Sequence, residues 1–135
     1  MSVFFDTSLL VYAQQAGPKG ERAADLIARG GVISVQVLNE LANVLRKKWR
    51  RDWPDVEAVL DDVRDAVDDV LPLSVETHSI ALEIARDHGL SFYDALIVAS
   101  ALQAGCETLF SEHMQNGRVF SALTIRNPFV EGAAP

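Results

Sequence analysis

Short apolar segments alternate with helical patterns along this chain, and that alternation restricts its fold more than any other feature of the sequence. Five apolar runs are predicted to be strands: Val3–Phe5, Val32–Ile33, Val70–Leu73, Thr108–Phe110 and Leu123–Ile125. Between these runs, apolar residues recur every three or four positions, as they do along one face of a helix. Strands that alternate with helices pair in parallel through right-handed crossovers, so helices cover both faces of the sheet. We therefore expect one α/β domain over residues 1–135, a three-layer α/β/α sandwich around a mostly parallel sheet of four to five strands.

Chain-breaking residues set the bounds of several predicted elements. Gly17-Pro18 breaks the chain before a helix over Lys19–Arg29. Pro54 has no amide hydrogen and interrupts the helix that begins at Ser34. Pro72 places the third strand near an edge of the sheet, since proline cannot donate to a strand ladder.

The composition restricts the cellular setting and the mode of nucleic-acid binding. Cys106 is the only cysteine, so no intrachain disulfide can form and a reducing compartment is expected. The N-terminus lacks the pattern of a signal peptide, and no apolar run is long enough to span a bilayer. These features predict a cytoplasmic protein with no membrane partner. The net charge of −7 argues against nucleic-acid binding through a broad basic surface, although it is compatible with a local basic patch.

Charge is segregated along the chain. The segment Arg46–Arg51 holds five cations in six positions, with Trp49 and Trp53 interleaved, and an acid-rich stretch follows over Asp52–Asp69. In one interpretation, these cations hold RNA phosphates and a tryptophan stacks on an unpaired base. In the other, the segment is a solvated helix end whose charges face the acidic helix, and whose tryptophans pack between the two helices or against a partner protein. The sequence leaves both interpretations open.

One carboxylate stands at the head of the most apolar helix. Asp94 falls on the same side of that predicted helix as Ile97 and Val98, and apolar residues cover the rest of its circumference. A buried carboxylate must be neutralised, hydrogen-bonded or bound to a cation. Ser91 to Asp94 also has the form of a capping box, in which the acid only satisfies a backbone amide at the start of the helix.

Three further acids are predicted at the edge of the sheet where the parallel strands end. Asp6 directly follows the first strand, and Glu112 follows the fourth strand after one residue. Glu40 borders the apolar stripe of the helix after the second strand, from which it can reach the same edge. Each has a simpler role, as a helix cap for Asp6, a partner of a neighbouring cation for Glu40 and a loop acid for Glu112. Acids that converge, however, require a hard cation such as Mg²⁺ or Mn²⁺, and such ions activate water for phosphodiester hydrolysis.

Three segments carry a family resemblance: Val3–Tyr12, Ile33–Glu40 and Ser91–Ala101. In order, spacing and flanking hydrophobic residues, they resemble the successive motifs of PIN-domain proteins, and in particular of VapC-type toxins. The resemblance extends to the Asn127-Pro128-Phe129 segment and so covers nearly the whole chain.

The resemblance implies an activity, partners and a site. The activity is that of a Mg²⁺- or Mn²⁺-dependent endoribonuclease, the toxin of a toxin–antitoxin pair, with a VapB-type antitoxin as partner and a homodimeric assembly. Asp6, Glu40 and Asp94 match the metal-binding acids of the family. The fourth position departs from the pattern, because family members commonly carry Asp two residues after a Ser or Thr, and here Ser111 is followed by His113.

Two residues are candidates to complete the site. Glu112 can reach in from the neighbouring position as a catalytic acid, or His113 can bind the metal or hydrogen-bond directly. Imidazole is a poor ligand for Mg²⁺ but an acceptable one for Mn²⁺. His113 can equally be an exposed residue of a turn.

Two other functions are compatible with the sequence. A degenerate PIN domain that has lost its fourth acid would act as a non-catalytic RNA- or protein-binding module. A phosphoacceptor domain of the receiver type shares the doubly wound topology and an acidic edge. It requires adjacent acids after the first strand and a lysine after the fifth, where this chain has Asp6-Thr7 and Ile125-Arg126.

Overall fold

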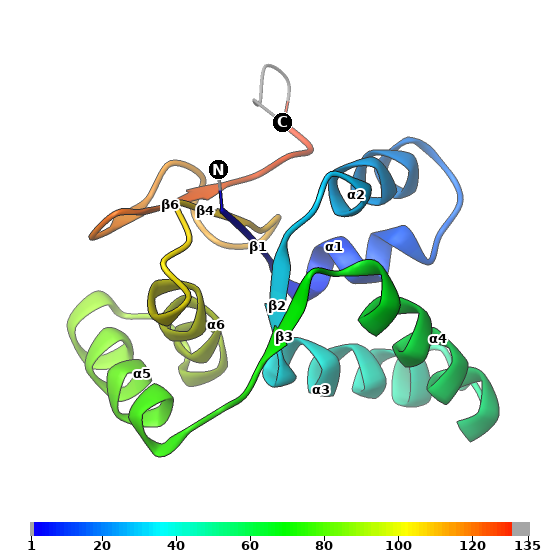
Figure 1. The fold of residues 1–135 in the computed structure, drawn as a ribbon, viewed down its shortest axis with the longest axis horizontal. Helices are drawn as coiled ribbons and strands as arrows, with labels where there is room; N and C mark the ends of the chain where they lie inside the picture. The colour runs from blue at the N-terminus through cyan, green and yellow to red at the C-terminus, as the bar shows by residue number, and fades with distance from the viewer. Residues whose placement is uncertain (1, 131–135) are drawn as a thin grey trace.

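A computed structural model describes residues 2–130 and shows a six-stranded sheet with helices on both faces (Figure 1). The strands are β1 (Val3–Phe5), β2 (Val32–Ser34), β3 (Asp69–Leu71), β4 (Thr108–Phe110), β5 (Val119–Phe120) and β6 (Leu123–Arg126). The helices are α1 (Thr7–Ala13), α2 (Pro18–Ala28), α3 (Val35–Asn43), α4 (Trp53–Ala66), α5 (Val75–His88) and α6 (Phe92–Gln103), and a π-helical turn, η1 (Val44–Lys48), continues α3. The expected three-layer α/β/α sandwich is confirmed. Within residues 2–130, no helix combines the length and the apolar character that a membrane crossing requires.

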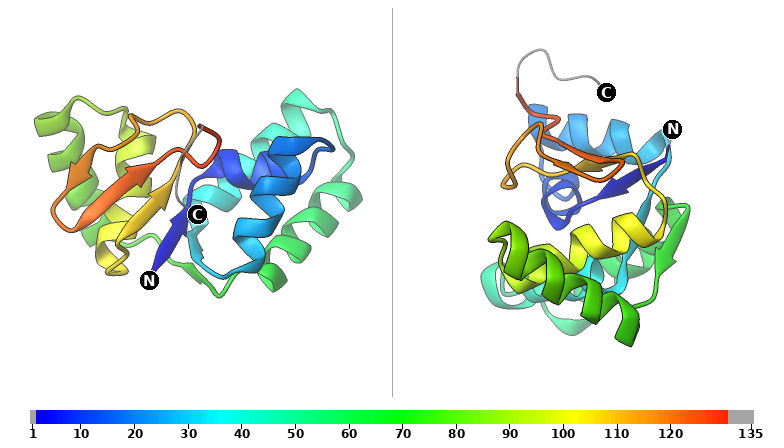
Figure 2. Two further views of the ribbon diagram at one scale, coloured as in Figure 1. Left: turned by 90° about the horizontal axis from the view of Figure 1, so that it is seen from above. Right: turned by 90° about the vertical axis from the view of Figure 1, so that its left-hand side faces the viewer.

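The strand order places β1 and β4 side by side in the sheet. The order is β3-β2-β1-β4-β6-β5, and each neighbouring pair is parallel except β5 with β6. The crossovers from β1 to β3 run in one direction, and the chain then returns across the sheet from β3 to β4. As a result, α1, α2 and α4 cover one face while α5 and α6 cover the other (Figure 2). The carboxyl ends of β1 and β4 meet where the direction reverses, which is where open parallel sheets bind their ligands.

Of the two edge strands of the sheet, the sequence predicts one and not the other. β3 lies at one edge, as expected, and Pro72 stands just beyond its last residue. β5 lies at the other edge, was not predicted, and brings the sheet to six strands rather than four to five. It has only two residues, and it pairs with β6 through a hairpin in which Ser121 adopts a φ of 55°. Two residues are too few to show a strand period, so local sequence does not reveal this strand.

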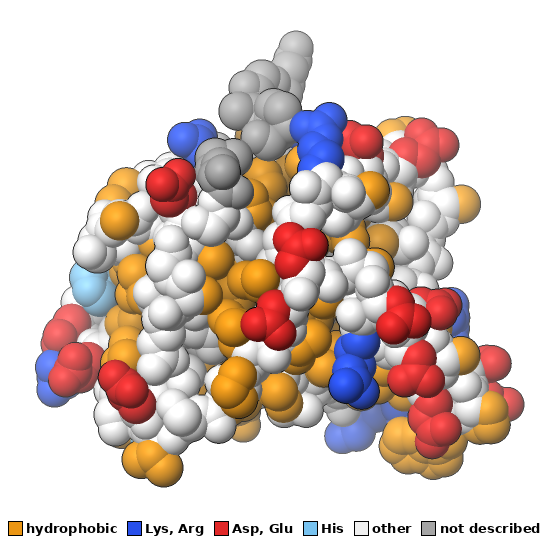
Figure 3. All heavy atoms as spheres, in the orientation of Figure 1, with side chains coloured by type: hydrophobic (Ala, Val, Ile, Leu, Met, Phe, Trp, Pro, Cys, Tyr) orange, Lys and Arg blue, Asp and Glu red, His pale blue; other side chains and the backbone are white. Residues whose placement is uncertain are grey.

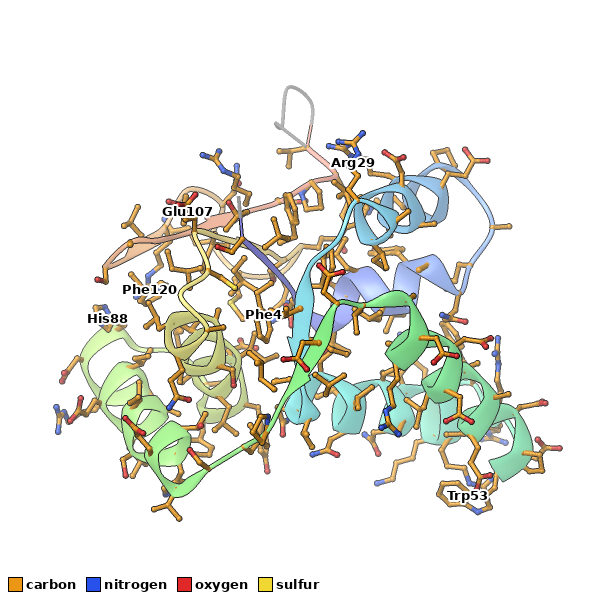
Figure 4. All side chains as sticks on the ribbon, in the orientation of Figure 1. Phe4, Arg29, Trp53, His88, Glu107 and Phe120 are labelled. Carbon is orange, nitrogen blue, oxygen red and sulfur yellow. The ribbon has the colours of Figure 1, made fainter. Side chains whose placement is uncertain are left out.

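The core is built on the aromatic residues of β1 and the small apolar residues of α6. Phe4 and Phe5 are fully buried, and the Phe5 ring stacks on Phe110 of β4 with a centroid distance of 6.4 Å. Every residue over Ala95–Ala101 is buried, as the apolar sequence of this helix predicts. Figure 4 shows Phe4 at the centre of the molecule. These contacts hold together the two strand ends at which the acids were predicted.

Helices α1 and α2 approach each other closely through Gly20. This residue is buried, and a methyl group on its Cα would lie 1.9 Å from the carbonyl oxygen of Gln15. Only a residue without a Cβ atom therefore allows α2 to begin so near the end of α1.

The Gly20→Ala variant is expected to be less stable than the wild type by about 1–3 kcal/mol, because the added methyl group must displace α2 from Gln15. In an unobstructed helix the same change stabilises by roughly 0.5–1 kcal/mol, so the sign of the effect tests the close packing. Urea denaturation measures the free energy of unfolding. The exposed neighbour Glu21→Gln serves as the control and is expected to change it by less than about 0.5 kcal/mol. An unaltered Gly20→Ala protein would contradict this packing.

Candidate functional site

Asp6, at the end of β1, is the buried centre of the candidate site. Its side chain is fully buried. Oδ1 accepts a hydrogen bond from the Thr7 amide at 2.7 Å, and Oδ2 accepts one from the Ser111 hydroxyl at 2.7 Å. Burial raises the pKa of Asp6 to about 6, although the neighbouring His113 and these hydrogen bonds oppose the rise. Asp6 therefore caps α1, as one interpretation of the sequence expected, and it also retains a need for positive charge near neutral pH.

The His113 ring lies between Asp6 and Asp94. Its Nδ1 atom is 3.2 Å from Asp6 Oδ2, and its Nε2 atom is 2.9 Å from Asp94 Oδ1. The hydrogen bond with Asp94, helped by the charges of both acids, raises the pKa of His113 to about 9. The ring is therefore protonated at neutral pH, and it donates from Nε2 to Asp94 while Nδ1 forms an ion pair with Asp6. The same hydrogen bond lowers the pKa of Asp94.

At the start of α6, Ser91 and Asp94 have different roles. The Ser91 hydroxyl accepts a hydrogen bond from the Asp94 amide at 3.3 Å and so caps the helix. The Asp94 carboxylate is half-buried and bonded to His113. Helix capping and the candidate site therefore use different atoms of the same two residues.

Thr7 connects Glu40 to Asp6. The Thr7 hydroxyl donates to Glu40 Oε1 at 2.6 Å while its amide donates to Asp6. The side-chain amide of Gln36, one turn earlier on α3, donates to Glu40 Oε2 at 3.0 Å. The negative charge of Glu40 contributes to the raised pKa of Asp6 and of His113. The structure thus gathers the three acids that match the family motifs around Thr7 and His113.

Glu112 faces away from these acids. Its Oε1 atom accepts a hydrogen bond from the Tyr12 hydroxyl at 2.7 Å, and its Oε2 atom accepts one from Lys19 Nζ at 2.6 Å. Partial burial raises the pKa of Glu112, but the bonds from Lys19 and Tyr12 outweigh it and lower the pKa overall. Of the two candidates for the fourth position, the structure brings His113 to the acids and not Glu112.

The turn after β4 explains this difference. The chain bends over residues 112–114, and the Ser111 hydroxyl, which donates to Asp6, also accepts a hydrogen bond from the Met114 amide at 3.3 Å. This turn brings His113 to Asp6 and Asp94, while Glu112 bonds to Tyr12 and Lys19. Because Ser111 meets Asp6 only in the folded sheet, the local sequence does not decide between Glu112 and His113.

A cluster around Glu112 was not found from the sequence. The rings of Tyr12 and Phe129 meet edge to face with centroids 4.9 Å apart, and Lys19 Nζ lies 5.0 Å from the Tyr12 ring centroid. The side-chain amide of Asn127 donates to the Glu112 carbonyl at 3.3 Å. The cluster secures the segment that carries His113. Its members come from distant parts of the chain, and no local pattern links them.

The acids are not arranged as a ready-made metal site. Across the described part of the chain, no group of three or more His, Cys, Asp or Glu side chains has an arrangement that could hold a metal ion. Instead, the His113 ring spans Asp6 and Asp94. The chemistry of the donors nevertheless fits a hard cation, since carboxylates and hydroxyls surround the buried Asp6. A cation that binds both Asp6 and Asp94 competes with the His113 imidazolium.

Comparison with known proteins identifies one family. The family model of the PIN domain matches residues 3–114. Among curated proteins, no sequence matches this chain.

Several solved structures share the fold. The VapC20 toxin of Mycobacterium tuberculosis, which cleaves the sarcin-ricin loop, is 23% identical with a TM-score of 0.65, over 81% of this chain and 88% of that one. VapBC2 of Rickettsia felis, bound to a fragment of promoter DNA, is 20% identical with a TM-score of 0.70, over 94% and 98% of the two chains. The DNA-bound VapBC of Salmonella typhimurium is 19% identical with a TM-score of 0.68, over 95% and 98%.

The stability of the metal-free protein is expected to fall as pH rises, in a window set by His113. Its pKa is raised to about 9 in the fold from 6.5, so its ion pairs stabilise fully below pH 6.5 and are lost as pH rises through about 9. Asp6, with a pKa raised from 3.8 to about 6, lowers the stability in a separate window between these two values. Urea denaturation in a chelator at about pH 6.5 and about pH 10 separates the effect of His113. The wild type is expected to lose more stability than His113→Gln, and an equal loss would contradict the ion pairs.

Proposed function

Because the chain belongs to the PIN domain family, we propose that it is a metal-dependent endoribonuclease and the toxin of a toxin–antitoxin pair. The observation that carries the proposal is the convergence of Asp6, Glu40 and Asp94 at the switch point between β1 and β4. The similarity to VapC20, a toxin that cleaves the sarcin-ricin loop, supports RNA as the substrate.

In this proposal, Asp6, Glu40 and Asp94 hold Mg²⁺ or Mn²⁺. When bound, such an ion activates water and stabilises the charge that develops on the phosphodiester. Thr7 and Ser111 fix the two oxygens of Asp6, and Gln36 fixes Glu40. The His113 imidazolium offers N–H donors and reduces the repulsion between these acids and an approaching phosphate. No nucleophilic side chain and no covalent intermediate is required.

The proposed partners are a VapB-type antitoxin and a second copy of the chain. The structures from Rickettsia felis and Salmonella typhimurium are VapBC assemblies, and their folds cover nearly the whole of this chain. They support the antitoxin as partner. A cytoplasmic location is proposed with it, in agreement with the single cysteine.

One observation favours a second candidate function, a non-catalytic binding module. His113 stands between Asp6 and Asp94 and already compensates their charge. A protein whose imidazolium never yields to a metal ion would bind RNA or protein without cleaving it. Calorimetric titration with Mn²⁺ separates the two functions, because the non-catalytic module would show no binding in the millimolar range or tighter.

Asp94→Asn is expected to reduce RNA cleavage in the presence of Mg²⁺ or Mn²⁺ by at least about 100-fold. The change keeps the shape of the side chain and the Ser91 cap, but it removes the charge that would bind the ion. Gel analysis of a labelled RNA measures the rate. The control is Asp87→Asn, which removes an exposed acid that pairs with Arg86 on α5. A wild-type rate for the purified Asp94→Asn protein would overturn the proposed function.

His113→Asp is expected to tighten Mg²⁺ binding by at least about tenfold, because it removes a competing cation and adds a carboxylate ligand. Calorimetry measures the affinity directly and independently of catalysis. His113→Asn, the matched control, removes the imidazolium without adding a charge and is expected to fall between the wild type and His113→Asp. If all three proteins bound Mg²⁺ equally, His113 would have no influence on the metal.

A further inference from the structure

A groove of about 680 Å³ runs beside α3, η1 and the start of α4. Its polar and aromatic lining consists of Asn39, Asn43, Arg46, Lys47, Arg50 and Trp53, and we call it the α3 groove. Lys and Arg side chains gather at the lower right of Figure 3, beside the acidic side chains over α4. Figure 4 places Trp53 at the tip of this part of the molecule. The lining combines cations, amides and an aromatic ring.

The cations of the α3 groove are not neutralised by neighbouring acids. Arg46, Lys47 and Arg50 are exposed. The ion pairs found among residues 2–130 include none of the three, although α4 and its acids begin nearby. The sequence left open whether these charges face the acidic helix, and the structure shows no such pairing in that range. Unpaired cations on a chain with a net charge of −7 favour binding of an external anion.

The backbone departs from regular helix where these cations are presented. Residues Val44–Lys48 form a π-helical turn, and such turns are found frequently at functional sites. Arg50 has a φ of 54°, a left-handed conformation that is uncommon for a residue with a side chain. Hydrogen bonds from the Arg51 amide to Leu45 and from Arg46 Nη1 to the Arg51 carbonyl, both 3.0 Å, hold this geometry.

Trp53 provides a surface for stacking. This residue is 57% exposed, which is unusual for a tryptophan. The Arg46 guanidinium lies 4.7 Å from the centroid of the Trp53 ring and supports it from one direction. An exposed aromatic ring beside cations is the arrangement on which unpaired bases stack in single-strand binding.

The α3 groove lies beside the acidic site. Asn43, which lines the groove, is three residues from Glu40 on α3, so the two side chains are neighbours on one face of the helix. At a rise of about 1.5 Å per residue, Arg46 stands only about 10 Å along the axis from Asn39. An RNA strand whose phosphate lies at the acids therefore has its adjacent nucleotides within reach of the groove.

We infer that the α3 groove binds the stretch of single-stranded RNA that flanks the cleaved phosphate. Lys47 and Arg50 contact phosphates, and Trp53 stacks on a base. The amides of Asn39 and Asn43 face base or sugar edges. This inference rests on the proposed function and names the part of the substrate that the chain holds. The lining also includes Trp53 and the side-chain amides of Asn39 and Asn43. These groups favour a nucleic acid, since cations alone would be enough to bind an acidic protein segment.

RNA binding is measured by fluorescence anisotropy with a labelled single-stranded oligoribonucleotide, in the Asp94→Asn protein and in a chelator, so that no cleavage occurs. Lys47→Ala combined with Arg50→Asn is expected to weaken binding about tenfold, and to reduce the slope of log affinity against log salt by about 1.4 because two phosphate contacts are lost. Asparagine is used at position 50 because it tolerates a left-handed backbone. The matched control is Lys48→Ala, which removes an exposed charge of the same turn that does not line the groove.

Trp53→Ala is expected to weaken binding about five- to tenfold without changing the salt slope, and Trp53→Phe is expected to restore most of the loss. Unchanged RNA affinity in the groove variants, or an equal loss in Lys48→Ala, would overturn the inference. Thermal unfolding verifies that each variant is folded. Binding is measured without metal and without cleavage, so the two proposals can fail separately. If the wild type cleaves RNA but the groove variants bind RNA normally, only the inference about the groove is refuted. Groove-dependent binding by a wild type that cannot cleave refutes the nuclease alone.

Discussion

The buried carboxylate of Asp6 is the group on which the arrangement of the site depends. It lies at the end of β1 in the interior, where an ionised group without donors is costly. Its donors come from Thr7 at the start of α1 and from Ser111, which is 105 residues away in sequence. Ser111 in turn directs His113 toward Asp6 and Asp94. The hydrogen bonds and ion pair of Asp6 therefore join the ends of β1 and β4, and His113 connects them to the start of α6.

Much of this convergence could be predicted because the topology of a parallel sheet is so restricted. Short apolar runs that alternate with helices predict the sheet, and right-handed crossovers place Asp6 and the residues after β4 at one edge. The β5 strand could not be predicted in this way, since its pairing depends on a hairpin and not on its own two residues. Topology thus specifies which strand ends meet, whereas the edges depend on local turns.

The directions of individual side chains could be predicted only in part. Glu112 and His113 are adjacent and chemically suited to the same position, and only the contact between Ser111 and Asp6 decides which one faces the site. The partners of Glu112 come from α1 and α2, which no local pattern connects to it. Helical periodicity likewise fails to predict side-chain directions from Val44 onward, because a π-helical turn replaces the regular α-helix there. Whether the cations of the basic segment pair with the acids of α4 could therefore not be predicted from the sequence.

Positive and negative charges lie in two different regions of the molecule, one suited to attract RNA and the other proposed to cleave it. Asp6 at the end of β1 and Asp94 at the start of α6 repel a phosphate unless His113 or a metal ion compensates them. The cations of the α3 groove supply attraction next to these acids, and screening over about 8 Å at physiological salt confines it to that region. The net charge of −7 then opposes any nucleic acid that meets a broad surface. In the proposed position along α3, a flexible single strand would gain the local attraction with the least exposure to that repulsion, whereas a rigid duplex would meet more of the acidic surface.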